Sequence, residues 1–173
     1  MAKTSLKDQK EDEKQIISEL IRDSNAPLGD IAEKLGFSRQ KVWRIIKRLE
    51  ETKVVWGYTA VVDLEKTGTK KYFIFVKWNT QPMGKDTLAI LSKGDIFSGF
   101  SIDSSYFIHG MFDWLFIVSV KDVVELKKFC NSLHTTFPRR ISEIQTAEVL
   151  VPVRVHGIDN PSSEKIFDFY SLD

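Results

Sequence analysis

The stretch from Gly36 to Tyr58 constrains the fold more than any other part of this chain. Gly36 is suited to ending one helix, and Ser38 is suited to capping the next. The residues that follow carry apolar side chains at helical spacing, namely Val42, Ile45, Ile46 and Leu49. After Thr52 the composition changes to strand-forming residues, with Gly57 between two short apolar runs. The sequence therefore predicts a helix with one buried face, followed by a short hairpin or wing.

The face of this predicted helix opposite the apolar stripe is basic. At about 100° per residue, Gln40, Arg44 and Lys47 fall opposite the stripe. Lys41 and Arg48 lie on one flank, and Arg39 and Trp43 lie on the other. Between Gly36 and Leu49 there are five basic residues and no acid. A solvated basic face is the alternative interpretation, but the local absence of acids disfavours it.

Two further amphipathic helices precede the basic one. The first is predicted from about Asp8 to Asp23, and a short second one carries Leu28, Ile31, Ala32 and Leu35 on one face. A short helix, a glycine turn and a longer basic helix make a helix-turn-helix, whose second helix enters the major groove of DNA. The first helix supplies the third wall of a small core.

Composition limits the class of protein and the way it binds. The chain has 173 residues, 42% of them hydrophobic and 28% charged, and a net charge of only +1. Residues 1–53 carry 12 Lys and Arg against 10 Asp and Glu, so attraction to DNA is confined to one face of one helix. Cys130 is the only cysteine, which excludes a disulfide within a monomer. We expect a cytoplasmic protein, because no signal peptide or membrane-length apolar run is present.

The remainder of the chain alternates strand and helix patterns. Strands are predicted at Tyr72–Trp78, Phe97–Ile108, Phe112–Val120 and Glu143–Val155. One helix is predicted at Asp86–Lys93, with Leu88 and Leu91 facing inward. Another is predicted at Asp122–Phe137, whose inward face is formed by Val123, Leu126, Phe129, Cys130 and Leu133. The order is βαββαβ, which is that of a ferredoxin-like unit.

These elements define the expected fold class and domains. The class is α+β, with an N-terminal winged helix-turn-helix domain followed by a ferredoxin-like βαββαβ domain for ligand sensing and dimerisation. The DNA-binding domain is expected at residues 1–63 and the linker at 64–70. The effector-binding and oligomerisation domain is expected at 71–157, followed by a C-terminal extension at 158–173, which is either disordered or docked on a neighbouring subunit.

The strand pattern also predicts a partner. Tyr72–Val76 and Trp114–Val118 are apolar at consecutive positions, so both faces of these strands require burial. Two helices on one side cover only one face of a four-stranded sheet. The other face is then too large an apolar patch for a monomer, and we expect a second copy to cover it.

The two halves together resemble the Lrp/AsnC family of leucine-responsive and asparagine-responsive regulators. The resemblance covers roughly residues 8–156. It includes IAEKLGFSRQKVWRIIKRLEETKVVWGYTAVVD, similar to the family's helix-turn-helix, wing and hinge, and IHGMFDWLFIVSV, similar to its Gly-x-x-Asp turn. It implies a regulator that binds double-stranded DNA as a homodimer, or as a tetramer or octamer built from dimers, and responds to an amino acid or related metabolite.

The resemblance also implies site residues. The DNA contacts would be Ser38, Arg39, Gln40, Lys41, Trp43, Arg44, Lys47 and Arg48. Gln40 and Arg44 suit adenine and guanine edges, and the lysines and Arg48 suit phosphates. We expect Trp43 to pack against the wing near Trp56 instead. The effector residues would be Gly110, Met111, Phe112, Asp113, Trp114 and Thr146, although the same turn is also compatible with a hairpin that binds nothing.

No catalytic constellation is predicted. The segment Met83–Thr87 lacks the first glycine of a phosphate loop, and the three histidines lack the paired spacing of a metal site. We therefore expect no enzyme activity, cofactor or metal. Two alternatives stay open. One is a metabolite-binding or assembly protein with a vestigial helix-turn-helix. The more distant one is a sirohaem-decarboxylase-like enzyme, whose characteristic His-Asn-Tyr-x-Arg stretch is absent here.

Overall fold

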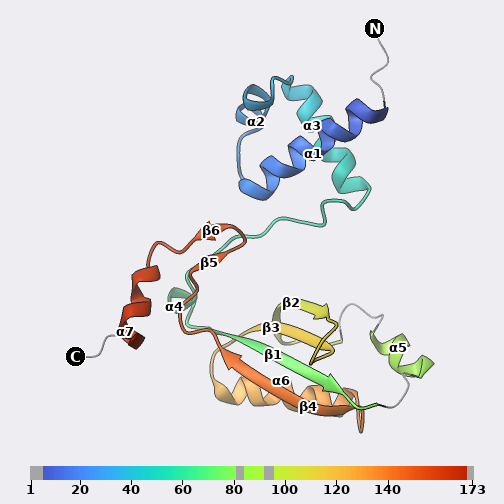
Figure 1. Ribbon diagram of the computed structural model, residues 1–173, viewed down its shortest axis with the longest axis vertical. Coiled ribbons are helices and arrows are strands. Elements are labelled where there is room, and N and C mark those ends of the chain that lie inside the picture. Colours follow the sequence, from blue (N-terminus) through green and yellow to red (C-terminus); the bar gives the residue numbers. More distant parts are fainter. Residues whose placement is uncertain (1–5, 81–83, 92–95, 171–173) are drawn as a thin grey trace. The chain divides into compact units, whose positions relative to one another are not determined.

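The computed structural model describes residues 6–80, 84–91 and 96–170, and it divides into two compact units. The first unit comprises the chain up to Val61 together with Arg154–Asp159, and the second comprises Val62–Val153 together with the residues from Asn160. Figure 1 gives the element labels used below. The two units are described separately.

The first unit is a three-helix arrangement built from α1 (Leu6–Arg22), α2 (Leu28–Leu35) and α3 (Arg39–Glu51). Gly36 ends α2 with a left-handed φ of 66°, which a residue without a Cβ adopts at little cost. The Ser38 hydroxyl accepts a hydrogen bond from the backbone N–H of Lys41 and caps α3. The core contains the predicted stripe of α3 together with residues of the two preceding helices: Ile16, Ile31, Ala32, Val42, Ile45, Ile46 and Leu49.

An ion cluster around the buried Glu19 carboxylate holds α1 to α2. The Glu19 carboxylate lies 2.6 Å from the Lys34 ammonium and 2.6 Å from the Arg22 guanidinium. The hydrogen bonds from Lys34 and then from Arg22 hold the pKa of Glu19 below its usual range. This charge is satisfied although it is buried, so the cluster fixes how the first two helices pack.

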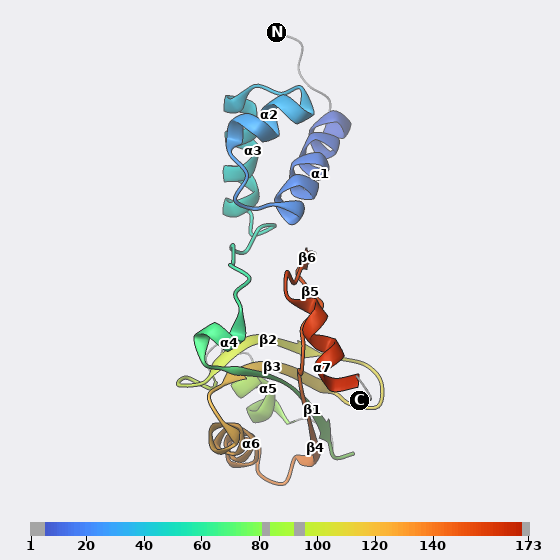
Figure 2. The same cartoon turned by 90° about the vertical axis from the view of Figure 1, so that its left-hand side faces the viewer.

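The second unit is a four-stranded antiparallel sheet with helices on one face. Its strands are β1 (Lys70–Trp78), β2 (Ser101–Phe107), β3 (Trp114–Val120) and β4 (Ile141–Glu148), in the spatial order β2-β3-β1-β4. Figure 2 shows α5 (Lys85–Leu91) and α6 (Val123–Thr136) on the same side of this sheet. The predicted fold class, an N-terminal helix-turn-helix followed by a βαββαβ unit, is confirmed.

Strand register separates the two faces of the sheet. Residues Tyr72, Ile74 and Val76 of β1 are buried and lie opposite Val118, Phe116 and Trp114 of β3 on the helix-covered face. The alternate residues form what we call the open face: Phe73, Phe75, Tyr106, Leu115, Ile117 and Ala147. Neither α5 nor α6 covers it, and Phe73, Phe75, Leu115 and Ile117 are only half-buried. The open face is therefore the apolar face that the sequence predicted.

Several predicted details differ from the structure. Residues 54–63 contain no strand, so the predicted hairpin is not formed within this chain; isolated two-stranded hairpins are marginal without a packing partner. The expected linker contains a short helix, α4 (Leu64–Thr67), capped by Asp63. Strand β4 ends at Glu148, seven residues before the predicted end, and Pro152 beyond it has no N–H to continue a ladder.

Two side chains predicted to face inward are exposed. Leu88 of α5 faces solvent, because Ile90 and Leu91 supply the packing contacts of that helix. Val123 is also exposed, since it is the first residue after the N-cap of α6 and lies beyond the sheet-facing stripe. The other predicted residues of α6 do pack on the core: Leu126, Phe129, Cys130 and Leu133.

Residues 154–170 contain four short elements. Strands β5 (Arg154–Val155) and β6 (Ile158–Asp159) form a hairpin whose two turn residues, His156 and Gly157, both have positive φ. That conformation matches the two-residue turn favoured in hairpins. A 3-10 helix, η1 (Ser163–Ile166), and a single helical turn, α7 (Phe167–Tyr170), are the last described elements.

Candidate nucleic-acid interface and effector turn

Helix α3 presents a polar face to solvent, and that face begins at its N-terminus. Ser38, Arg39, Gln40 and Arg44 are exposed, while the stripe that starts with Val42 is buried beneath them. Neither Arg39 nor Arg44 has an ion-pair partner among the residues that the structure describes. Their guanidinium groups, and the Gln40 amide between them in the sequence, are therefore available to an external ligand.

Lys41 and Arg48 are positioned differently from the other predicted contacts. The Lys41 ammonium lies 2.7 Å from the Asp12 carboxylate, and the Arg48 guanidinium lies 2.7 Å from the Glu13 carboxylate. Lys41 also sits 3.6 Å from the centroid of the Phe37 ring. Both basic side chains are half-buried and tie α3 to α1. Sequence reasoning missed these pairs because the acids belong to a distant helix.

Lys47 lies near the end of the exposed face and is part of a small network. Its ammonium lies 3.0 Å from the Glu50 carboxylate, which also accepts a 3.0 Å hydrogen bond from the Tyr58 hydroxyl. The contact with Lys47, and then the one with Tyr58, lowers the pKa of Glu50. Burial and the neighbouring carboxylate raise the pKa of Tyr58. The network links α3 to the extended chain that follows it.

Trp43 does not pack as predicted. Its side chain is 52% exposed, and Trp56 is 92% exposed. The two rings make no contact among the described aromatic pairs, so Trp56 provides no platform for Trp43. The reason is that residues 54–63 form no hairpin that would bring the two rings together. Trp43 instead stays on the solvent side of α3, beside Arg44.

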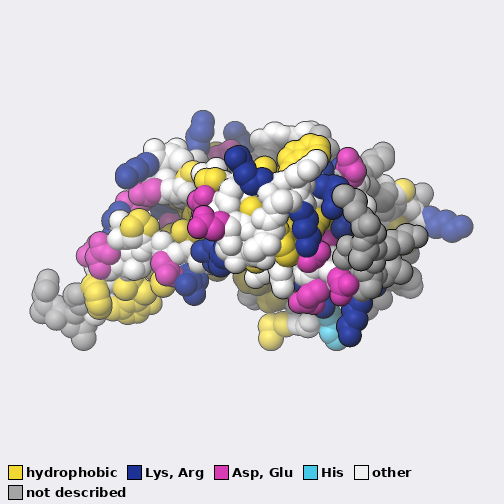
Figure 3. Space-filling view, turned by 90° about the horizontal axis from the view of Figure 1, so that it is seen from above, with side chains coloured by type: hydrophobic (Ala, Val, Ile, Leu, Met, Phe, Trp, Pro, Cys, Tyr) yellow, Lys and Arg dark blue, Asp and Glu magenta, His cyan; other side chains and the backbone are white. Residues whose placement is uncertain are grey.

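Charge on the surface is mixed rather than uniformly basic. In Figure 3, dark-blue Lys and Arg side chains stand among magenta Asp and Glu side chains. This distribution agrees with the net charge of +1. Attraction for an anionic partner must therefore come from a local group of unpaired cations, as α3 provides.

The predicted effector turn is closed by Asp113. Its carboxylate Oδ2 accepts a 2.8 Å hydrogen bond from the backbone N–H of Trp78, and its own N–H donates to the Val76 carbonyl at 3.0 Å. Its carbonyl accepts a third bond, from the Ile108 N–H at 2.9 Å. Asp113 thus joins the end of β1 to the β2–β3 connection. The other carboxylate oxygen, Oδ1, has no hydrogen-bond partner among the described residues.

The side chains around this turn separate into two groups. Gly110 and Met111 are exposed at the turn, and no atom lies within 4 Å of the place where a Cβ of Gly110 would be. The Phe112 ring lies 5.3 Å from the Phe75 ring, which belongs to the open face. These residues share the turn with Asp113, as predicted.

Trp114 and Thr146 do not lie with this group. Trp114 is 3% exposed, donates its indole N–H to the Ser105 hydroxyl at 2.8 Å and stacks on Phe107 and Trp78 within the core. The prediction that Trp114 frames an effector pocket is therefore wrong. Thr146 lies opposite Ile74, with β1 between it and β3. One chain does not bring Thr146 to the turn.

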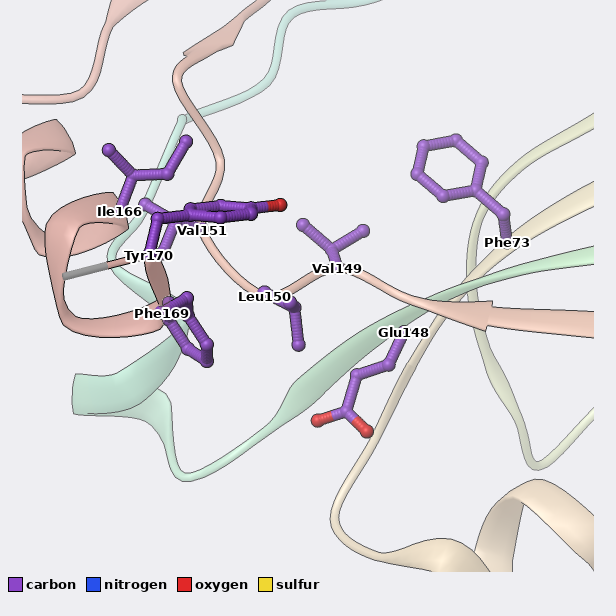
Figure 4. Close-up of a pocket in the computed structure, with 8 residues that line it drawn as sticks. All are labelled: Phe73, Glu148, Val149, Leu150, Val151, Ile166, Phe169 and Tyr170. Atoms are coloured by element: carbon purple, nitrogen blue, oxygen red, sulfur yellow. The ribbon is translucent and has the colours of Figure 1, made fainter. Parts of the chain in front are cut away.

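A cavity of about 280 Å³ lies at the other end of β1, where the sequence predicted no site. It is bounded by Phe73 of the open face, by the chain that follows β4 and by the C-terminal residues Ile166, Phe169 and Tyr170. Figure 4 shows the Tyr170 hydroxyl directed toward the side of the cavity where Phe73 lies. Only the apolar character of the tail could have indicated this cavity from the sequence.

Comparisons with known proteins agree with this architecture. A family model described as winged helix-turn-helix DNA-binding matches residues 13–55. The Bkd operon transcriptional regulator of Pseudomonas aeruginosa is 29% identical over 143 residues, which are 82% of this chain and 91% of that regulator. The crystal structure of an AsnC family transcriptional regulator from Agrobacterium tumefaciens matches with a TM-score of 0.63 at 25% identity, over 83% of this chain and 91% of that one.

In both sequence and fold, the chain is similar to Lrp/AsnC-type DNA-binding transcriptional regulators. A further structure, the feast or famine regulatory protein of M. tuberculosis complexed with L-methionine, matches with a TM-score of 0.65 at 23% identity, over 87% of this chain and 96% of that one. In this chain a helix-turn-helix precedes a domain with an antiparallel sheet, which matches Lrp/AsnC structures.

Within residues 6–80, 84–91 and 96–170, no helix has the length and apolar character needed to cross a membrane. In the same ranges, no group of three or more His, Cys, Asp and Glu side chains is arranged to hold a metal ion. The named relatives are transcriptional regulators.

Proposed function

We propose that this Lrp/AsnC-like protein reads DNA with six exposed residues of the α3 region: Ser38, Arg39, Gln40, Trp43, Arg44 and Lys47. The observation that carries the proposal is the exposed N-terminal half of α3, where Arg39 and Arg44 have no ion-pair partner among the described residues. A recognition helix contacts base edges with its N-terminal residues. The division into a DNA-reading domain at 1–63 and a sensing and oligomerisation domain at 71–157 is part of the proposal.

Each side chain has a role that follows from its chemistry. Arg44 offers two parallel N–H donors to the O6 and N7 atoms of guanine, and Gln40 pairs with the N6 and N7 atoms of adenine. Ser38, Arg39 and Lys47 contact phosphates at the ends of the helix. Lys41 and Arg48 act indirectly, because their pairs with Asp12 and Glu13 hold α3 against α1.

We further propose that the protein acts as a homodimer, or a ring of dimers, joined through the open face of the sheet. The support is that α5 and α6 lie on the other face of the sheet, while Phe73, Phe75 and Ile117 lie on this face and are only half-buried. Apolar patches of this kind mark association sites. A two-fold axis then presents two copies of α3 to half-sites in successive major grooves.

An amino acid is the proposed effector, and the turn at Gly110–Asp113 is the proposed contact. The M. tuberculosis relative was solved with L-methionine. In this chain the Asp113 Oδ1 atom is an acceptor suited to an α-ammonium group, while Oδ2 is already bound to the Trp78 N–H. Trp114 lies in the core and takes no direct part. Thr146 contributes only if a second copy brings it to the turn.

Selection of bound fragments from random DNA, followed by fluorescence anisotropy on the enriched site, tests the DNA contacts. Arg39→Ala should weaken binding to every sequence alike, because it removes a phosphate contact. Lys128→Ala is the matched control: it removes the same charge from an exposed position on α6. Equal weakening by both substitutions would refute α3 as the contact surface and leave only a general effect of net charge.

A further inference from the structure

The C-terminal segment after β6 is held to the sheet domain at two points. The Asn160 side-chain amide donates to the Pro152 carbonyl at 2.7 Å, and the Asn160 N–H donates to the Val153 carbonyl at 2.9 Å. Further along, the Lys165 ammonium pairs with the Glu65 carboxylate of α4. Elements η1 and α7 therefore occupy a defined place.

The apolar side chains of this segment do not serve the core of their own domain. None of them belongs to the core cluster of the sheet domain, which is formed by residues between Tyr72 and Ile144. Phe167, Phe169 and Tyr170 are 66%, 52% and 72% exposed. Three aromatic side chains on a short, tied helical turn are costly to leave in water, so the fold of one chain does not explain them.

The cavity connects this segment to the open face. Phe73 lies on the face opposite the buried Ile74, and it lines the cavity together with Phe169 and Tyr170. Helix α7 consequently lies on the open-face side of the sheet, and Figure 2 shows it on the side away from α6. The C-terminal helix and Phe73 of the open face therefore border the same cavity.

The lining of the cavity favours an apolar occupant over a polar small molecule. Its one charged side chain, Glu148, already accepts a hydrogen bond from Lys70 at 2.7 Å and one from Tyr72 at 2.7 Å. Sites for small ligands have a few convergent polar groups and span roughly 300–1,000 Å³. Here the volume is about 280 Å³, and the Tyr170 hydroxyl is the remaining polar group of the lining side chains.

We propose that η1 and α7 are elements of the dimer interface, and that the cavity between α7 and Phe73 receives an apolar side chain from a second copy of this chain. This inference rests on the proposed dimer through the open face. A two-fold interface brings the same patch of each subunit together, so each copy both offers a cavity and fills one. Elements η1 and α7 thereby enlarge the contact area between the two subunits at the end of the sheet near Glu148.

Sedimentation equilibrium of the full chain tests this proposal with three variants. The double variant Phe169→Ser with Tyr170→Ser removes the cavity wall and should weaken the dimer at least about tenfold, which corresponds to about 1.4 kcal/mol. Phe167→Ser is the matched control, because Phe167 belongs to the same helical turn but does not line the cavity. This substitution should change the dimer dissociation constant by less than about twofold. Ile117→Asp, on the open face, should abolish the dimer.

The outcomes separate this inference from the proposed dimer. If Ile117→Asp breaks the dimer and the double variant leaves it unchanged, the role of the tail is refuted while the sheet interface stands. If the wild-type chain is monomeric at every concentration, the proposed dimer and the proposed role of η1 and α7 are both refuted. Hydrogen exchange of the wild-type protein gives a second measurement. Amides of residues 163–170 should exchange more slowly above the dimer dissociation constant, and unchanged exchange there would overturn the proposal.

Discussion

Arg44 and Arg48 are both arginines of α3, yet the structure gives them different tasks. Arg44 is exposed and has no ion-pair partner among the described residues. Arg48 is half-buried and lies 2.7 Å from Glu13 of α1. We expect Arg44→Ala to impair DNA reading without destabilising the first unit, and Arg48→Ala to do the reverse. The pair is a matched comparison, because the same side chain is removed from the same helix.

The expected magnitudes follow from these environments. Arg44→Ala should change the stability by no more than about 0.5 kcal/mol, as other surface substitutions do. If Arg44 contacts guanine, Arg44→Ala should reduce the free energy of DNA binding by about 1–3 kcal/mol at one base position. This corresponds to a loss of about 5- to 150-fold in affinity for the preferred base. The pair of Arg48 with Glu13 is partly solvated, so Arg48→Ala should cost roughly 1 kcal/mol or less of stability. In a unit of this size, 1 kcal/mol lowers Tm by about 4–8 °C.

Two measurements on each variant are sufficient. Thermal unfolding followed by circular dichroism reports stability, and anisotropy on the selected site and its single-base variants reports specificity at constant salt. Arg44→Ala should lose discrimination at one position with an unchanged Tm. The reasoning is refuted if Arg48→Ala is the variant that loses discrimination, or if Arg44→Ala lowers Tm as much as Arg48→Ala does.

Two further predictions concern carboxylates. Because Lys34 and Arg22 hold the pKa of Glu19 below its unfolded value, the stabilisation from Glu19 is present above that value and is lost as the pH falls through the folded pKa. Glu19→Gln should therefore lower Tm at pH 7, with a difference from wild type that disappears in acid; a difference independent of pH would contradict this assignment. Asp113→Asn keeps an acceptor for the Trp78 N–H but removes the charge, so it should abolish amino-acid binding measured by calorimetry without changing Tm. A variant that binds like wild type would leave Asp113 a purely structural residue.

The sequence predicts α3 well because its signals are local. Gly36, Ser38 and the apolar stripe from Val42 act within a few residues of one another, and each determines a helix end or a buried face. The ion pairs of Lys41 and Arg48 depend on how α1 crosses α3, which no local pattern contains. The helix and its exposed face were therefore predictable, whereas the division of its basic residues between packing and binding was not.

For the strands, the sequence pattern does not determine which residues face which side of the sheet. The run Trp114–Val118 is apolar at consecutive positions, so its pattern predicts burial of both faces without assigning either one. The pairing register with β1 determines the face on which each residue of β3 lies. Trp114 shares the helix-covered face with Phe116, and Ile117 lies on the open face. The error over Trp114 as an effector residue follows directly from this ambiguity. The prediction of a second copy does not depend on this ambiguity, because it requires only that both faces of the strands are apolar.

The number of unpaired cations on α3 makes the salt dependence of DNA binding a measure of how many copies bind. Arg39, Arg44 and the weakly paired Lys47 give about three phosphate-neutralising charges per chain, and log K falls with log salt at about 0.9 per charge. Between 50 and 200 mM salt, one chain would then lose roughly 40-fold in affinity and a dimer roughly 10³-fold. We expect the steeper value for wild type, measured by anisotropy on the selected site. The dimer-breaking Ile117→Asp should show the shallower value, because each chain then binds alone. A steep salt dependence in Ile117→Asp would mean that basic residues outside the exposed face of α3 carry the electrostatic attraction. A shallow salt dependence in the wild-type protein would mean that the two copies of α3 do not bind DNA together.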